Sequence, residues 1–327
     1  MTQIGDGRIV VSGLTKVFGS KVRAVDQLSF EVEPGAVTGF LGPNGAGKTT
    51  TLRMILGLVH PTAGTATIGG QVYRQIHDPL RVVGAALESS SFHPARTARN
   101  HLRIMCAAAG LPYARADEVL ATVGLSDVAK RKVRGYSMGM RQRLGLAVTL
   151  LGDPKVLILD EPANGLDPEG IRWLRNFLRY LAEQGRTVLV SSHQLNEVQE
   201  VADRVVILDR GRLIRSGSIS ELTAGNDSVV VRTPQPQVLA SALAAAGLSV
   251  GFEPLESDGP DGRSPTLRVG TGDSAQVGHI AFTAGAELHE LRLDRFDLEQ
   301  LFFALTEGDF SAPSPGQLPP PATEGPR

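Results

Sequence analysis

A glycine-rich loop within residues 39–57, "GFLGPNGAGKTTTLRMILG", constrains the fold more than any other stretch of this sequence. A strand-like run leads into it, an amphipathic helix follows, and the loop fits G-x-x-x-x-G-K-S/T through Gly42, Gly47, Lys48 and Thr49. Its glycines permit a tight turn whose backbone N–H groups cradle phosphates beside the positive end of a helix. We therefore predict a nucleoside triphosphate site in an α/β fold, formed by Gly42, Pro43, Asn44, Gly45, Ala46, Gly47, Lys48, Thr49 and Thr50.

Two acidic residues follow a second apolar run in "KVLILDEPANGLDP", residues 155–168. Ligands of open α/β sheets collect at the carboxyl ends of the strands, which is where Asp160 and Glu161 are predicted to lie. We expect Lys48 to reach the β- and γ-phosphates, and Thr49 and Asp160 to hold Mg²⁺. Glu161 is placed to polarise a water for in-line attack on the γ-phosphate. The two stretches together predict Mg²⁺-dependent hydrolysis of a nucleotide.

The composition is that of a globular protein that carries no broad charged surface. The chain has 327 residues, 42% of them hydrophobic and 20% charged, and a net charge of -1, which argues against a broad nucleic-acid surface. A single cysteine, Cys106, excludes an intrachain disulfide and a multi-cysteine metal site. No run approaches the ~18 to 20 apolar residues that span a bilayer, and the N-terminus lacks the pattern of a signal peptide. We expect a cytoplasmic chain that reaches a membrane only through another polypeptide.

The first 225 residues alternate strand-like and helical patterns, as a parallel α/β sheet requires. Residues 89–150 differ, because they show helical periodicity and no strand pattern, which predicts a helical subdomain inserted into the α/β domain. The strands are expected within 8–13, 36–40, 81–87, 155–160, 186–192 and 203–209, and the helices near 48–57, 97–109, 114–123, 137–151, 168–183 and 195–202.

Residues 226–308 are predicted to form a small accessory α+β domain with the order β-α-β-β-α-β, which resembles a ferredoxin-like unit. The amphipathic stretch 296–305 fits either a core helix or an interface helix. The last residues, 309–327, are rich in proline and lack periodicity, so we expect them to be disordered.

A third stretch, "RGYSMGMRQRLGLAVTLL" at residues 134–151, resembles the signature of the ATP-binding subunits of ABC transporters. In that family a serine- and glycine-rich segment opens a helix and binds the γ-phosphate held by the opposite subunit. Four residues match the family pattern L-S-G-G-Q-x-Q-R, namely Ser137, Gly139, Gln142 and Arg143. Tyr136, Met138 and Met140 depart from it.

Further positions of this family occur in order along residues 8–225. The resemblance implies that Asp167, in "NGLD", belongs to a loop linking two active sites, and that His193 is a catalytic switch residue contacting the γ-phosphate. Phe18 stands where the family stacks an aromatic ring on adenine. The family's magnesium-contacting glutamine is absent, and Glu88 is its best replacement as a metal ligand.

The resemblance therefore implies an ABC-type P-loop ATPase that binds ATP and Mg²⁺ and closes as a homodimer around two ATP molecules. Such a dimer would power a separate transmembrane permease at the cytoplasmic face of the cell membrane. Several stretches look most like exporter subunits linked with drug or antibiotic efflux, and no direct contact with nucleic acid is expected.

Two other functions remain open from the sequence alone. One is a soluble ABC ATPase acting on ribosomes or DNA, although such proteins usually carry two cassettes, coiled coils or zinc-binding cysteines. The other is a P-loop kinase or GTPase. The absence of an N-K-x-D motif disfavours a GTPase, and Glu161 directly after Asp160 favours water as the phosphoryl acceptor.

Overall fold

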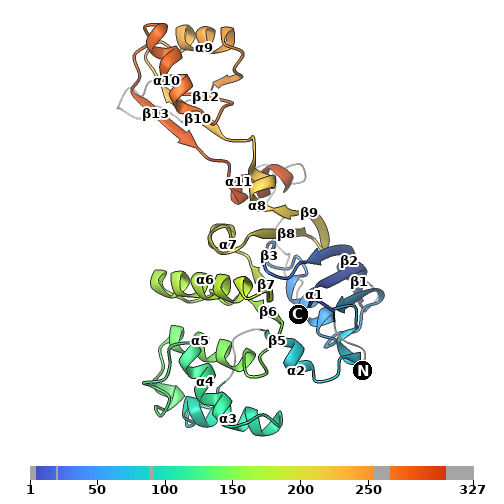
Figure 1. The fold of residues 1–327 in the computed structure, drawn as a ribbon. Coiled ribbons are helices and arrows are strands. Elements are labelled where there is room, and N and C mark those ends of the chain that lie inside the picture. Colours follow the sequence, from blue (N-terminus) through green and yellow to red (C-terminus); the bar gives the residue numbers. More distant parts are fainter. Residues whose placement is uncertain (1–4, 20, 88–91, 253–265, 307–327) are drawn as a thin grey trace, which may run out of the picture.

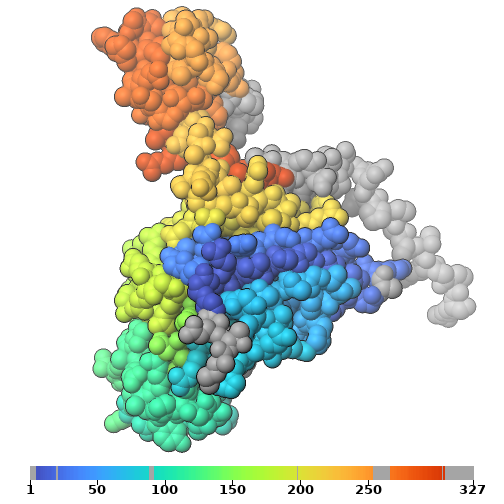
Figure 2. Space-filling model, turned by 45° about the vertical axis from the view of Figure 1, so that its right-hand side comes forward, coloured from blue at the N-terminus to red at the C-terminus, as the bar shows by residue number. Residues whose placement is uncertain are grey.

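The computed structural model describes residues 5–19, 21–87, 92–252 and 266–306, and Figure 1 shows their arrangement. A six-stranded sheet occupies the middle of the molecule, with a helical lobe at one end and a small α+β lobe at the other. The space-filling view in Figure 2 shows the α+β lobe joined to the rest through a narrower neck. The predicted α/β fold with a helical insert and a small accessory lobe is confirmed.

The central sheet brings together strands that lie far apart in the sequence. Its order is β5-β6-β7-β3-β8-β9, and every pair is parallel except β8 with β9. The predicted parallel sheet is therefore confirmed, with one antiparallel strand added at its edge. The strands are β3 (Val37–Leu41), β5 (Val83–Ala86), β6 (Val156–Asp160), β7 (Thr187–Ser192), β8 (Arg204–Asp209) and β9 (Arg212–Ser218).

This sheet is buried on both faces, which explains why its strands read as continuous apolar runs. Leu41 and Leu159 point into a core shared with α6, α7 and the helical insert. Phe40 and Ile158, their neighbours in the chain, point into a second core shared with α1 and a separate antiparallel sheet. The helices around the sheet are α1 (Lys48–Ile55), α2 (Pro79–Val82), α6 (Pro168–Glu183), α7 (Leu195–Val201) and α8 (Ile219–Thr223).

The antiparallel sheet is the main element that the sequence analysis missed. It has the order β2-β1-β4, formed by β2 (Val22–Val32), β1 (Ile9–Phe18) and β4 (Ala63–Ile68). The strand expected at residues 8–13 therefore pairs in this sheet and not in the parallel one. In β2 the burial alternates from Leu28 to Val32, so the half-buried pattern of an antiparallel strand was present in the sequence.

The helical subdomain contains three helices, and residues 92–150 form no regular strand, as predicted. The helices are α3 (Ala98–Ala108), α4 (Ala114–Thr122) and α5 (Met138–Thr149). Their buried side chains, such as Leu102, Leu120 and Leu144, join the core on the α6 face of the central sheet. No helix of the described residues has the length and apolar character needed to cross a bilayer.

The accessory lobe has the predicted order β-α-β-β-α-β. Its antiparallel sheet has the order β11-β12-β10-β13, and Val229, Leu239, Leu267 and Val277 contribute to a core of its own. Residues 309–327, predicted to be disordered, lie outside the described residues. The elements of the lobe are β10 (Ser228–Arg232), α9 (Pro236–Ala245), β11 (Val250–Phe252), β12 (Thr266–Val269), α10 (Ser274–Thr283) and β13 (Glu290–Asp294).

The last described helix, α11 (Leu298–Thr306), follows the accessory sheet in the chain but packs against α7 and α8. Leu298 and Leu301 are buried in the core that the central sheet shares with α6, α7 and the helical insert. We call the part of the chain before the accessory lobe, residues 5–225, the cassette. Asn196 Nδ2 donates to Glu299 Oε2 at 3.1 Å, which ties α11 to the segment that follows β7. Of the two roles open for residues 296–305, the structure therefore supports a core helix, and the core is that of the cassette.

We expect Leu298→Ala to destabilise the cassette by about 2 to 5 kcal/mol, because the Leu298 side chain is fully buried. The only tryptophan of the chain, Trp173, lies on α6, so its fluorescence in a urea titration reports the cassette. Leu291→Ala, at a site 39% exposed on β13, is the matched control and should leave that transition in place. An unchanged Trp173 transition in Leu298→Ala would show that α11 does not stabilise the cassette.

Candidate functional site

The phosphate loop, residues 42–47, runs from the carboxyl end of β3 to the first turn of α1. A Cβ at Gly42 would lie 2.5 Å from the Leu208 carbonyl oxygen, and one at Gly47 would lie 2.5 Å from that of Ala24. Gly47 also has φ of 96°, a conformation that side chains disfavour. These two glycines let the loop pass close to β8 and β2. The other predicted loop residues, Pro43, Asn44, Gly45, Ala46 and Thr50, lie in the same loop or in the first turn of α1.

Lys48 is folded over this loop. Its Nζ donates to the Gly42 carbonyl oxygen at 2.6 Å and to that of Pro43 at 3.3 Å. The same nitrogen lies 3.6 Å from Glu161 Oε1, so the predicted phosphate-binding cation and the predicted base form an ion pair. Burial lowers the pKa of Lys48, and the Glu161 carboxylate acts in the opposite direction. In a complex with ATP, the γ-phosphate would take the place of Glu161 as the anionic partner of Lys48.

Thr49 and Asp160 meet across the gap between α1 and β6. Thr49 Oγ1 donates to Asp160 Oδ2 at 2.8 Å, and the Ser191 hydroxyl donates to Oδ1 of the same carboxylate. A hydroxyl and a carboxylate oxygen at this separation suit a hard cation such as Mg²⁺, which keeps several waters and takes few protein ligands. The donor set therefore fits the predicted metal. Glu88, the third predicted ligand, lies outside the described residues.

Glu161 occupies an unusual backbone conformation at the end of β6. Its φ is 51°, in the left-handed region, and its N–H donates to the Ser191 carbonyl and hydroxyl oxygens, at 3.2 and 3.0 Å. Non-glycine residues in this region cost roughly 1–3 kcal/mol and cluster at functional sites. The carboxylate lies 2.9 Å from Nδ1 of His193, which follows the neighbouring strand β7. The three side chains predicted to be catalytic, Lys48, Glu161 and His193, therefore meet at one end of the sheet.

The signature and linking-loop residues form a second site. Ser137 caps α5, because its hydroxyl accepts from Met140 N at 3.3 Å, and Asp167 caps α6 by accepting from Gly170 N at 2.9 Å. Together with Gly139 they line a pocket to which no described residue of the phosphate loop contributes. The pocket at Ser137 and the phosphate loop are therefore formed by different residues of the chain.

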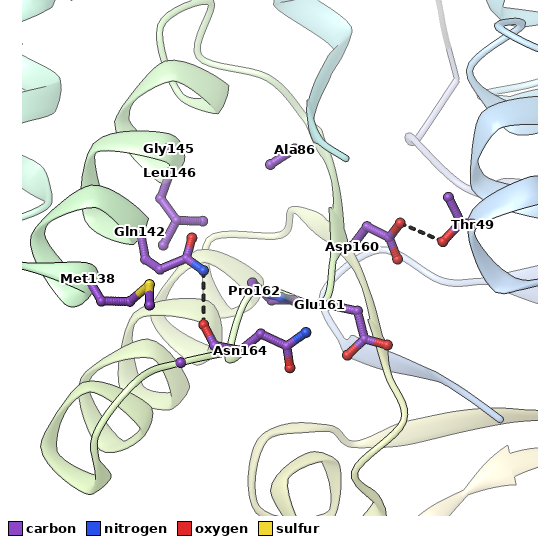
Figure 3. A pocket seen from close by; sticks show the side chains of 11 residues that line it. Thr49, Ala86, Met138, Gln142, Gly145, Leu146, Asp160, Glu161, Pro162 and Asn164 are labelled. Atoms are coloured by element: carbon purple, nitrogen blue, oxygen red, sulfur yellow. Dashed lines mark hydrogen bonds between the residues drawn. The ribbon is translucent and has the colours of Figure 1, made fainter. Parts of the chain in front are cut away.

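A pocket of 460 Å³ lies between α5 and the strand ends. Figure 3 shows Thr49, Asp160 and Glu161 on one side of it, and Met138 and Gln142 of α5 across from them. The Gln142 amide donates to the Asn164 carbonyl oxygen at 3.2 Å.

Phe18, the predicted adenine partner, ends β1 and is 45% exposed. Lys16 Nζ lies 5.0 Å from the centroid of the ring. An exposed ring at the end of a strand is available for stacking.

Ser191 is the residue of this site that the sequence analysis missed. It contacts both Asp160 and Glu161 through hydrogen bonds, although it precedes His193 by only two positions. A serine pair closing an otherwise apolar strand, "TVLVSS", was the available signal.

Comparisons with known proteins agree with this geometry. Residues 25–164 match a family described as ABC transporter, and residues 227–299 match a domain of unknown function. The chain is 36% identical to the bacitracin transport ATP-binding protein BcrA of Bacillus licheniformis, over 92% of this chain and 97% of that protein. It is 35% identical to the daunorubicin/doxorubicin resistance ATP-binding protein DrrA of Streptomyces peucetius, over 91% and 92%. A solved ATP-binding subunit of an ABC transporter superposes with a TM-score of 0.59 at 27% identity, covering 65% of this chain and 91% of that one.

Proposed function

This chain belongs to the ATP-binding subunits of ABC transporters, and we propose on that premise that it powers export of an antibiotic-like compound through a separate permease. It is an ATPase, and the proposal concerns how it works and for what cargo. The observation that carries the mechanism is the meeting of Lys48, Glu161 and His193 at the carboxyl ends of three adjacent strands.

In the proposed mechanism Lys48 and the loop amides hold the β- and γ-phosphates of ATP. Glu161 accepts a proton from the attacking water, and His193 orients the carboxylate through the contact at Nδ1. Thr49 and Asp160 would hold Mg²⁺, which when bound neutralises charge on the phosphates. Ser191 keeps Asp160 and Glu161 in place through its hydroxyl and carbonyl groups.

The separation of the two sites supports a homodimer. Ser137 opens a helix whose N-terminus attracts phosphate, yet it lines a pocket apart from the phosphate loop of its own chain. In a dimer with two-fold symmetry, Ser137 and Gly139 of each chain contact the nucleotide bound on the phosphate loop of the other chain. Two ATP molecules are then held between two chains. Phe18 stacks on the adenine of each, and Asp167 lies near the interface between the two chains.

The names of the relatives support the cargo class. Two proteins named for bacitracin transport and for daunorubicin and doxorubicin resistance align over more than nine tenths of this chain, including the accessory lobe. We propose a bulky antibiotic as cargo and a permease that holds the dimer at the cytoplasmic face of the membrane. The same relatives favour this function over a soluble ATPase acting on ribosomes or DNA.

Purification of the full chain from its native cells in mild detergent tests this proposal. We expect a protein with several membrane-spanning helices to accompany it, and cells lacking both proteins to become more sensitive to bacitracin or daunorubicin. Copurification with ribosomes or nucleic acid, with unchanged sensitivity to both compounds, would contradict the transport function. Phosphate release by the purified dimer serves as the control for an intact enzyme.

A further inference from the structure

The beginning of the signature helix α5 touches the loop that carries the catalytic glutamate. A Cβ placed on Gly165 would lie 3.1 to 3.3 Å from three side-chain atoms of Met138, so the thioether covers that glycine. One turn further, the Gln142 amide donates to the Asn164 carbonyl oxygen at 3.2 Å, as drawn in Figure 3. Two residues one helical turn apart on α5 thus contact two adjacent residues of the loop.

The loop in turn connects to Glu161. The N–H of Asn164 donates to the Glu161 carbonyl oxygen at 3.2 Å and closes a turn directly after the catalytic residue. Glu161 is itself held in a left-handed conformation, which persists only where the surrounding contacts impose it. A displacement of Asn164 and Gly165 therefore changes the backbone that aims the Glu161 carboxylate.

A third contact joins α5 to the helix after this loop. The guanidinium of Arg143 lies 4.2 Å from the centroid of the Trp173 ring on α6, and Trp173 stacks on Phe177 at 5.0 Å. The loop between β6 and α6, residues 161–167, therefore contacts α5 at its middle. Its far end is held through α6, which begins at Pro168 and also packs against α5. The 460 Å³ pocket on the other side of Met138 and Gln142 leaves room for α5 to move relative to Thr49 and Asp160.

We propose that Met138 and Gln142 are positioning residues. Through them, the presence or absence of a nucleotide at Ser137 changes the position of Glu161 in the same chain. The proposal rests on the homodimer proposed above. Ser137 senses the ATP molecule bound by the partner copy, whereas Glu161 serves the ATP molecule on its own phosphate loop. Contacts from Met138 and Gln142 to residues 164–165 therefore make occupation of one site set the catalytic base of the other.

The chemistry of the two side chains suits this task. Methionine is unbranched and follows a moving surface without losing contact, whereas the glycine of the family pattern at this position has no side chain to cover Gly165. Gln142 adds a directional hydrogen bond to a backbone oxygen, and this bond fixes the register of the loop against α5.

Steady-state phosphate release by the full-length chain, measured against ATP concentration, tests the proposal. The wild-type dimer should show a Hill coefficient between 1 and its limit of about 2 for two sites. In Met138→Ala and Gln142→Ala we expect kcat to fall about 10-fold and the Hill coefficient to approach 1, since coupling between sites is typically worth ~5- to 150-fold. Affinity for a fluorescent ATP analogue without Mg²⁺ should stay unchanged, and so should the unfolding transition of Trp173.

Two further variants separate positioning from packing. Met138→Leu keeps an apolar side chain of similar volume over Gly165 and should restore most of the turnover and the cooperativity. Met105→Ala removes the same side chain from a half-exposed site on α3 and should behave as wild type.

The outcomes are distinct for the two proposals. A wild-type chain that fails to pair in ATP overturns the homodimer and this inference together. A wild-type chain that pairs, and whose kcat and Hill coefficient survive both Met138→Ala and Gln142→Ala, overturns this inference alone. A Hill coefficient of about 1 in a wild-type chain that pairs overturns it as well.

Discussion

Glu161→Gln is expected to lower kcat at least about 100-fold, because general-base catalysis typically contributes ~10²- to 10⁴-fold and an amide cannot take the proton from water. The amide is nearly isosteric, so it can remain beside His193 Nδ1 and Lys48 Nζ. ATP affinity should therefore change little. Since hydrolysis is what reopens the proposed dimer, the variant should accumulate as pairs in ATP. Phosphate release and light scattering on a gel-filtration column measure the two effects.

The matched control for this variant is Glu183→Gln. Glu183 is the exposed last residue of α6, in the same domain and far along the helix from the loop. The Glu183→Gln variant should retain wild-type turnover and should be monomeric once the ATP is consumed. Turnover of Glu161→Gln close to that of the control would show that another group activates the water.

The catalytic half of the site was predictable because its residues lie at the carboxyl ends of apolar strands or in the segments that follow them. Lys48, Asp160 and His193 stand in three separate sequence stretches, yet parallel strands buried on both faces align their carboxyl ends. The sequence analysis did not establish that β7 lies between β6 and β3. That adjacency places Ser191 against Asp160, and it arises from pairing between segments about 30 residues apart.

Other features depend on contacts that no local pattern encodes. The apolar face of α11 fits either the accessory lobe or the cassette, and only its packing on α7, about 100 residues earlier, decides between them. Met138 could be recognised only as a departure from a glycine pattern, and its partner Gly165 belongs to a different loop. The accessory sheet, by contrast, was predictable since its β-branched runs and two helices pack locally on one another.

Lys48→Met is expected to weaken ATP binding by about 10- to 150-fold, since a hydrogen bond to a charged group contributes ~1.5–3 kcal/mol. Turnover should fall further, because Lys48 also offsets the charge that develops on the γ-phosphate. Loss of affinity should be smaller for ADP, which lacks the γ-phosphate. Titration with fluorescent ATP and ADP analogues measures the difference, and phosphate release measures turnover.

The folded state should tolerate this change. Lys48 is a buried cation whose pKa is lowered by desolvation, so an apolar side chain of similar length removes that desolvation cost. The Glu161 carboxylate loses its ion pair with Lys48 but keeps its contact with His193 Nδ1. The Trp173 unfolding transition should therefore stay near that of the wild type. Lys155→Met, at an exposed lysine beside β6, is the matched control and should bind both nucleotides normally. Equal losses for ATP and ADP in Lys48→Met would mean that Lys48 contacts the inner phosphates and not the γ-phosphate, and the ion pair with Glu161 would then not mark the place where hydrolysis occurs.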